Sequence, residues 1–135
     1  MSAVFEPQPK VDLHARDSRE RLARMLMELF DHWKIAAADQ AALLGLSAQS
    51  RSSLARYRRG EPLADNADLL ARAGHLLGIH KALRILFPHD RDLADRWVSA
   101  ANRRFGGALP LDIMRRHGYE GILAVRRYLD FERGR

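Results

Sequence analysis

The stretch that decides the fold is DQAALLGLSAQSRSSLARYRRG, residues 39–60. Asp39 can cap a first short helix, because a short polar side chain accepts the free backbone N–H groups of a first turn. Gly45 then ends that helix, since glycine tolerates the left-handed conformation found just past a helix end. Ser47 can cap the next helix, which we expect to run to about Arg58.

These two expected helices, joined by a tight glycine turn, predict a helix-turn-helix, whose second helix enters the major groove of DNA. Ala41, four residues before Gly45, supplies a small side chain where the two helices must approach each other closely. The alternative is a plain helical hairpin with a solvated arginine face.

The second expected helix has side chains suited to nucleic acid. Residues 46–60 contain four arginines and no acidic residue. Arg51 or Arg56 can form a forked pair of bonds to a guanine, while Arg58 and Arg59, at the helix end, are placed for phosphates. The candidate DNA-binding residues are Ser47, Gln49, Ser50, Arg51, Ser53, Arg56, Arg58 and Arg59.

Upstream of this stretch we expect one amphipathic core helix, which Asp17 or Ser18 can cap. Its apolar residues recur at spacings of three and four, which is one face of an α-helix. They are Leu22, Met25, Leu26, Leu29, Phe30 and Trp33. Residues 1–16 contain two prolines and little apolar content, so we expect a flexible N-terminal arm there.

Downstream, glycine and proline divide the chain into short helices. Asp65 can cap a helix that Gly78 ends, and the helix after it ends before Pro88, because the residue before a proline is pushed out of the helical region. Asp90 or Asp92 starts the next helix.

The last part of the chain begins with a loop at the paired glycines Gly106 and Gly107. Pro110 suits the first turn of the helix that follows, and Gly118 ends that helix. A last amphipathic helix runs from about residue 120 to 129. No segment alternates with period two over a useful length, so the expected fold is all-α, a helical bundle without a sheet.

Charge and composition narrow the class of partner. Of the net charge of +6, residues 38–64 hold +2 and residues 91–135 hold +4, since ten arginines there face six acids. Such clusters favour phosphate backbones or acidic protein surfaces. There are no cysteines, no apolar run approaches the roughly 20 residues of a membrane span, and the start lacks a signal-peptide pattern. We therefore expect no contact with a membrane and a cytoplasmic location.

Residue constellations for catalysis or metal binding do not stand out. The six histidines have no metal-ligand spacing, and no paired carboxylates or activated nucleophile are visible. Gly106-Gly107 follows no strand and precedes no Gly-Lys-Ser/Thr, so a sharp turn between helices is expected rather than a phosphate loop. We expect a binding protein that is not an enzyme and uses neither a metal nor a cofactor.

Two resemblances organise these observations. Residues 39–60 resemble the Xre-like helix-turn-helix family through Ala41-x-x-x-Gly45, Leu46-Ser47 and Tyr57-Arg-Arg-Gly60. The stretch from Ser47 to Tyr57 is longer than the common pattern, so Arg51 falls where that family has an apolar core residue. We expect Leu54 and Tyr57 to do this packing instead.

The C-terminal third is similar to the toxin-binding domain of the MbcA/ParS/Xre antitoxin family. The matching features are Trp97, Asn102, Gly107, Pro110-Leu111, Val125-x-x-x-Leu129 and a terminal glycine. The resemblance implies the antitoxin of a type II toxin-antitoxin system. Its partner would be a RES-domain toxin that consumes NAD⁺, whose active site it blocks, and the pair would repress its own operon by binding operator DNA.

Specific residues and boundaries follow. The expected domains are residues 17–64, an Xre-like helix-turn-helix, and residues 65–135, a helical toxin-binding domain. Arginine and tyrosine are favoured interface anchors, so we expect an exposed toxin-binding tip. The tip comprises Arg126, Arg127, Tyr128, Asp130, Glu132, Arg133 and Arg135. The module is organised by Trp97, Asn102, Gly106, Gly107 and Pro110.

Two other functions remain open from sequence. One is a stand-alone helix-turn-helix transcriptional regulator, and the other is an adaptor whose helix-turn-helix serves only dimerisation. A homodimer within a larger toxin-antitoxin complex is expected, because palindromic operators match two-fold proteins. The first helix, with Met25, Phe30 and Trp33, is one candidate for the dimer surface.

Overall fold

The computed structural model describes residues 11–135, and the regular structure in that part of the chain is entirely helical. The expected all-α fold is therefore confirmed. Its α-helices are α1 (Arg16–Trp33), α2 (Ala37–Leu43), α3 (Ser53–Arg58), α4 (Ala67–Leu86), α5 (Arg91–Arg96) and α6 (Pro110–Arg133). Three short 3-10 turns lie between them: η1 (Ala48–Ser50), η2 (Trp97–Ser99) and η3 (Arg103–Phe105). Most of the expected arm at residues 1–16 lies outside the described residues.

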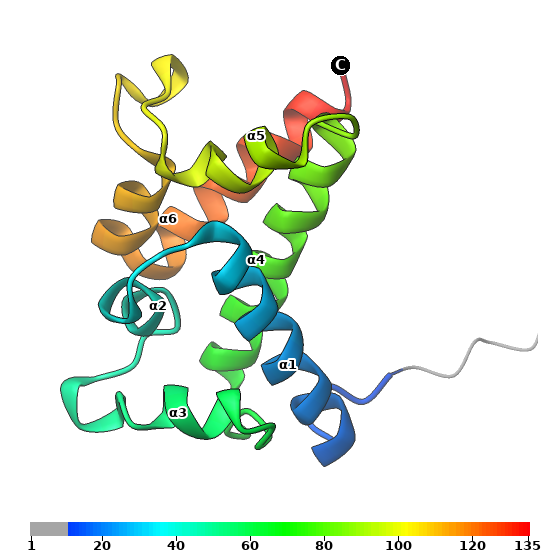
Figure 1. Cartoon of the computed structure of the whole chain (residues 1–135), viewed down its shortest axis with the longest axis vertical. Helices are drawn as coiled ribbons and strands as arrows, with labels where there is room; N and C mark the ends of the chain where they lie inside the picture. Colours follow the sequence, from blue (N-terminus) through cyan, green and yellow to red (C-terminus); the bar gives the residue numbers. More distant parts are fainter. Residues whose placement is uncertain (1–10) are drawn as a thin grey trace, which may run out of the picture.

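The long helix α4 forms the centre of the fold, with α1 and α5 packed against it and α6 along its length (Figure 1). One buried cluster contains apolar side chains from all six α-helices. Its largest members include Phe30 of α1, Leu43 of α2, Leu76 of α4 and Ile122 of α6. The N-terminal and C-terminal halves of the chain therefore share a continuous core.

Gly78 does not end a helix, contrary to the sequence-based expectation. Helix α4 continues through it to Leu86, because a glycine inside a helix costs only about 1 kcal/mol and the buried side chains on both sides offset this. Gly78 serves packing instead. A Cβ built there would lie 2.6 Å from the guanidinium carbon of Arg126, so the glycine makes room for that side chain.

Gly118 interrupts the helical conformation, as expected. Gly118 has φ 59° and ψ −134°, which are not helical, so α6 consists of two helical halves joined by a kink at this residue. Pro110 occupies the first turn, as predicted, and the second half extends to Arg133 rather than to residue 129. The two halves lie very close, since a Cβ at Gly121 would overlap the carbonyl oxygen of Ile113.

Several predicted caps are displaced by one or more residues. Helix α1 begins after Ala15, before Asp17 and Ser18, and α2 begins after Ala36, so that Asp39 lies in its first turn. Asn66, not Asp65, caps α4 by accepting a bond from the Leu69 amide at 3.0 Å. The prediction is right for α5, where Asp90 accepts from the Leu93 amide at 3.0 Å.

Candidate functional site

The turn between α2 and the next helical segment has the predicted geometry. Gly45 has φ 69°, and the Leu46 amide donates to the Ala41 carbonyl at 2.9 Å. Ala41 is almost fully buried, which agrees with a close helix approach. The second helix differs from prediction. It consists of η1 followed by α3, and Ser47 makes no side-chain cap but donates to the Ser50 hydroxyl.

Packing of α3 follows the irregular spacing of the sequence. Arg51 points to solvent, while Leu54 and Tyr57 are 7% and 4% exposed and pack into the core. The Tyr57 hydroxyl also accepts a bond from the Ala64 amide at 3.4 Å. The expected replacement of the missing apolar residue by Leu54 and Tyr57 is therefore present in the structure.

Most of the candidate DNA-binding side chains are exposed, with one clear exception. Ser53 is only 7% exposed, and its hydroxyl accepts a bond from Arg56 Nη2 at 2.9 Å. It is therefore placed as a packing residue at the start of α3 and not as a free contact to DNA. Ser50 is half-buried. The exposed candidates are Ser47, Gln49, Arg51, Arg56, Arg58 and Arg59.

The exposed arginines differ in how they are held. Arg58 donates to Asp31 at 3.0 Å and to the Gln40 side-chain oxygen at 3.1 Å, so it fastens α3 to both α1 and α2. Arg56 and Arg59 lie 3.9 and 4.0 Å from the carboxylate of Glu61. In the described part of the chain, no hydrogen bond or ion pair is recorded for the guanidinium of Arg51. Arg51 is consequently the arginine best placed to contact an external phosphate or base.

The predicted C-terminal tip is only partly a free surface. Arg127, Asp130, Arg133 and Arg135 are exposed, whereas Arg126, Tyr128 and Glu132 are half-buried. The guanidinium of Arg126 lies over Gly78 and bonds the Nδ1 atom of His75 at 2.9 Å. Arg126 therefore holds α6 against α4, which corrects its expected role as an exposed anchor.

His75 is the centre of this contact between helices. Its Nε2 atom lies 3.0 Å from the hydroxyl of Tyr119 and its Nδ1 atom accepts from Arg126. Burial and then the positive charge of Arg126 lower the pKa of His75 below its ordinary value. A neutral ring fits both bonds, with Nδ1 as acceptor and a proton on Nε2.

An aromatic cluster holds the glycine loop against α6. The rings of Trp97 and Tyr128 stack at 6.3 Å, and Phe105 meets Tyr128 edge-on at 5.1 Å. Burial is the main cause that raises the pKa of Tyr128. Asn102 caps η3 by accepting from the Arg104 amide at 2.9 Å, and Gly106 and Gly107 turn the chain in the left-handed region. Of the predicted organising residues, Trp97, Asn102, Gly106 and Gly107 therefore lie in this loop and its cluster, and Pro110 starts α6.

Comparison with protein families places both halves of the chain. Residues 12–78 match the antitoxin Xre-like helix-turn-helix domain, and residues 82–135 match the antitoxin Xre/MbcA/ParS C-terminal toxin-binding domain. The chain belongs to the Xre/MbcA/ParS antitoxin family. The antitoxin is also similar to "Uncharacterized protein y4oB" of Sinorhizobium fredii (strain NBRC 101917 / NGR234). The two are 39% identical over 104 residues, which cover 77% of this chain and 78% of the relative.

The two matched domains indicate the general function of the chain. A toxin-binding domain implies a toxin partner and a helix-turn-helix implies DNA binding, so the two suggest the antitoxin of a toxin-antitoxin system. Domains of both kinds are typically non-enzymatic. The helices of residues 11–135 include none that is long and apolar enough to cross a membrane, and those residues contain no group of three side chains suited to hold a metal ion.

The structure adds one candidate that sequence reasoning missed. Phe131 of the antitoxin is 65% exposed, and the guanidinium of Arg135 lies 6.0 Å from the centre of its ring. The spacing of apolar residues could have predicted this exposure, because Phe131 lies off the buried helical face formed by Ile122, Val125 and Leu129. An exposed aromatic residue among arginines is a typical interface anchor.

Proposed function

We propose that this antitoxin neutralises a RES-type, NAD-consuming toxin by covering its active site with the end of α6, and represses its own operon through α3. The observation that carries the proposal is the order of the two matched domains. In addition, α3 and the end of α6 lie at opposite ends of the molecule (Figure 1), and both have exposed arginines. The RES chemistry of the toxin comes from the family resemblance, and the chain's own arginines agree with it.

The toxin-binding surface proposed is the exposed part of the tip. Arg127, Arg133 and Arg135 offer planar guanidinium groups that suit a pocket evolved for phosphates, such as those of NAD⁺. Phe131 supplies an apolar anchor beside them, whose burial in a toxin pocket would add to affinity. Together they form a small apolar centre with a charged rim, as protein interfaces often do.

Deleting the whole tip is a poor test of this surface. Removal of residues 126–135 would take away Leu129, which is 1% exposed, and Tyr128, which belongs to the aromatic cluster. We expect such a deletion to unfold the C-terminal half, so loss of neutralisation would not identify the contact residues.

Substitution of exposed residues is the sharper experiment. The double variant Arg127→Glu, Phe131→Ala should lose neutralisation of a RES toxin in cells and binding to the purified toxin, with unchanged urea unfolding. Arg116→Glu is the matched control, since Arg116 is exposed on the first half of the same helix α6. Full protection by the double variant would refute the proposed contact surface. Failure of the native chain to bind a RES toxin would refute the toxin class.

Operator binding is tested through Arg51. Because its guanidinium makes no recorded contact within residues 11–135, Arg51→Ala should weaken binding to the upstream operator without lowering stability. Arg58→Ala should lower both the affinity for the operator and the stability of the protein, since that side chain also bonds Asp31 and Gln40. Native DNA affinity in the Arg51→Ala variant would favour a helix-turn-helix that serves only dimerisation. Strong operator binding with no toxin partner would favour the stand-alone regulator.

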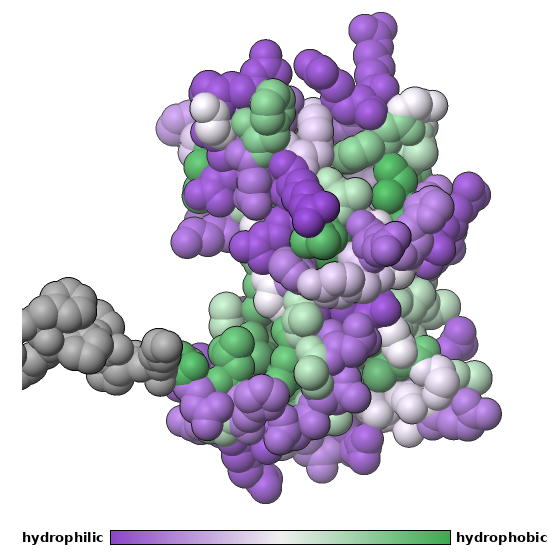
Figure 2. Space-filling model, turned by 180° about the vertical axis from the view of Figure 1, so that it is seen from behind, coloured by the Kyte–Doolittle hydropathy of each residue, from purple (hydrophilic) through white to green (hydrophobic). Residues whose placement is uncertain are grey.

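We also infer a symmetric dimer, as operator palindromes require. Phe30 and Trp33 are buried within one chain, so they are not available as dimer contacts. An apolar patch along the first part of α1 and the residues before it remains, where Val11, Leu13 and Met25 are 70%, 50% and 43% exposed. Figure 2 shows hydrophobic side chains gathered where the described chain begins. Met25→Glu should lower the molar mass in light scattering if this patch pairs two copies, and leave it unchanged otherwise.

A further inference from the structure

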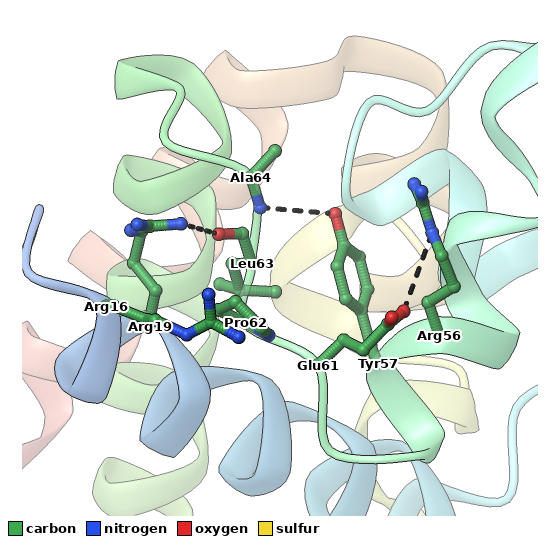
Figure 3. Close-up of a pocket in the computed structure, with 8 residues that line it drawn as sticks. All are labelled: Arg16, Arg19, Arg56, Tyr57, Glu61, Pro62, Leu63 and Ala64. Carbon is green, nitrogen blue, oxygen red and sulfur yellow. Dashed lines mark hydrogen bonds and ion pairs between the residues drawn. The ribbon is translucent and has the colours of Figure 1, made fainter.

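A cavity of ≈ 340 Å³ lies between the beginning of α1, the end of α3 and the loop that joins α3 to α4 (Figure 3). Three of its lining residues are arginines and one is acidic: Arg16, Arg19, Arg56 and Glu61. These side chains give the cavity a net charge of +2. A concave site lined by several guanidinium groups suits an anion, because the N–H donors of each guanidinium form a fork that matches phosphate oxygens.

Arg19 forms a rigid wall of this cavity. Its Nε donates to the His14 carbonyl at 2.8 Å and its Nη1 donates to the Leu63 carbonyl at 2.8 Å. The Leu63 amide in turn donates to the Arg19 carbonyl at 3.1 Å. Two neutral carbonyls orient this guanidinium, and no ion pair of Arg19 is recorded in residues 11–135. Its positive charge is therefore held in place at the edge of the cavity, where it also helps the hydrogen bond from His14 to lower the pKa of Asp65.

Arg16 and Arg56 are the adjustable partners of Arg19. Arg16 is 76% exposed in its side chain, and among residues 11–135 its partner is Glu20, one turn along α1, at 3.0 Å. Arg56 is 54% exposed, donates to the Ser53 hydroxyl at 2.9 Å and lies 3.9 Å from Glu61, a separation too long for a strong bond. Both side chains can turn toward a bound anion at little cost, and Figure 3 shows them on opposite sides of the cavity from α1 and α3.

The position of the cavity indicates which kind of anion would bind there. Arg56 belongs to α3, the segment proposed to enter the major groove, and α1 packs directly on α3. The start of α1 and the end of α3 lie together at one end of the molecule (Figure 1). Groups that flank a recognition helix meet the sugar-phosphate backbone, and such contacts position a protein on DNA without reading sequence.

We propose that the cavity formed by Arg16, Arg19 and Arg56 receives a backbone phosphate of DNA. This inference rests on the proposed operator binding, and adds to it an anchoring site in which Arg16 and Arg19 lie outside the predicted DNA-binding segment and Arg56 contacts a phosphate and not a base. Because the site reads charge and not sequence, its loss should affect operator and unrelated DNA by the same factor.

The test compares Arg16→Ala with Arg96→Ala in the full-length antitoxin. Both arginines form an exposed ion pair one turn along a helix at 3.0 Å, but Arg96 lies on α5. Arg16→Ala should lower the slope of log K against log salt by about 1 and weaken binding to operator and unrelated duplexes alike, by about eightfold at 0.1 M salt. Arg96→Ala should change neither. Equal behaviour of the two variants overturns the assignment.

Two further outcomes separate this inference from the proposed function. If the native antitoxin binds operator with the salt slope unchanged in Arg16→Ala, the phosphate site is wrong and operator binding stands. If the native chain binds no DNA, both fail. A titration with inorganic phosphate, followed through the arginine Nε–H resonances, adds a third arm. The deciding result there is that phosphate moves the Nε–H resonances of Arg16 and Arg19 while Arg16→Ala leaves the slope of log K against log salt for DNA unchanged. That combined result would assign the cavity to a free anion and overturn the DNA assignment.

Discussion

The guanidinium of Arg115 lies 3.1 Å from the carboxylate of Asp39, which joins α6 directly to α2. A second bridge between the two matched domains is the bond of Arg126 on α6 to the Nδ1 atom of His75 on α4, at 2.9 Å. The first family match ends at residue 78 and the second begins at residue 82, so the boundary between them falls inside helix α4. The toxin-binding half and the helix-turn-helix are therefore packed as one body.

The Asp39–Arg115 pair should contribute little to stability. Its side chains are 21% and 44% exposed, and partly exposed ion pairs contribute about 0.2–1 kcal/mol. Arg115 also pairs with Asp112 at 2.7 Å, so Arg115→Ala alone removes two contacts. A double-mutant cycle with Asp39→Asn, followed by urea unfolding, should give a coupling of about 0.5 kcal/mol that shrinks in 1 M salt. A coupling above about 2 kcal/mol would mean that the pair behaves as buried.

Gly118→Ala should destabilise the antitoxin by about 1–3 kcal/mol, because φ 59° with ψ −134° is a conformation that only glycine adopts readily. Gly74→Ala is the control. Gly74 lies inside α4 with open space where its Cβ would stand, so this change should stabilise by up to about 1 kcal/mol. Urea unfolding of both variants measures the difference. Equal stability of the two variants would contradict the bend at Gly118.

The helical bundle itself was accessible from sequence, because apolar residues spaced by three and four dominate every long segment. Residue type alone misled at Gly78. A glycine that ends a helix and a glycine that admits a neighbouring side chain look the same in sequence. Here the neighbour is Arg126, 48 positions away, and no local pattern predicts that contact.

The candidate sites were predictable as segments and less so as individual residues. Arg51 is exposed as its polarity indicates, whereas Ser53 is buried because it begins α3 on the inward side, next to Leu54. Arg19 had no signal at all. Its role depends on two backbone carbonyls, and their positions follow from the path of the chain and not from any motif.

Gly78→Ala should raise the pKa of His75. The added Cβ would lie 2.6 Å from Arg126 Cζ, so the guanidinium must move away and its charge no longer opposes protonation of the ring. Arg126→Leu should act in the same direction. Gly74→Ala, one turn earlier, should leave the pKa unchanged. NMR titration of His75 measures all three, and an unchanged pKa in the first two would mean that burial alone lowers it.

Acid should destabilise the antitoxin through His75 and His80. Burial lowers the pKa of both, aided by Arg126 at His75 and by Arg84 and His32 at His80, while Asp130 and Asp95 act in the opposite direction. The unfolded chain then binds more protons than the folded chain once the pH falls below the ordinary histidine pKa of about 6.5. The free energy of unfolding should therefore be flat near pH 8 and fall from about pH 7 to pH 5.

Variants identify the groups responsible for this pH dependence. His75→Asn keeps an acceptor for Arg126 but cannot take up a proton, and His80→Gln removes the second titration. The double variant should lose less stability between pH 7 and pH 5 than the native chain. His14→Gln is the contrasting control, because the hydrogen bond and charge of Asp65 raise the pKa of His14. The stabilisation by His14 is fully present below its unfolded pKa and is lost as the pH rises through its folded pKa, so removing it should steepen the acid loss. Parallel curves for all variants would show that carboxylates, and not these histidines, set the acid limit.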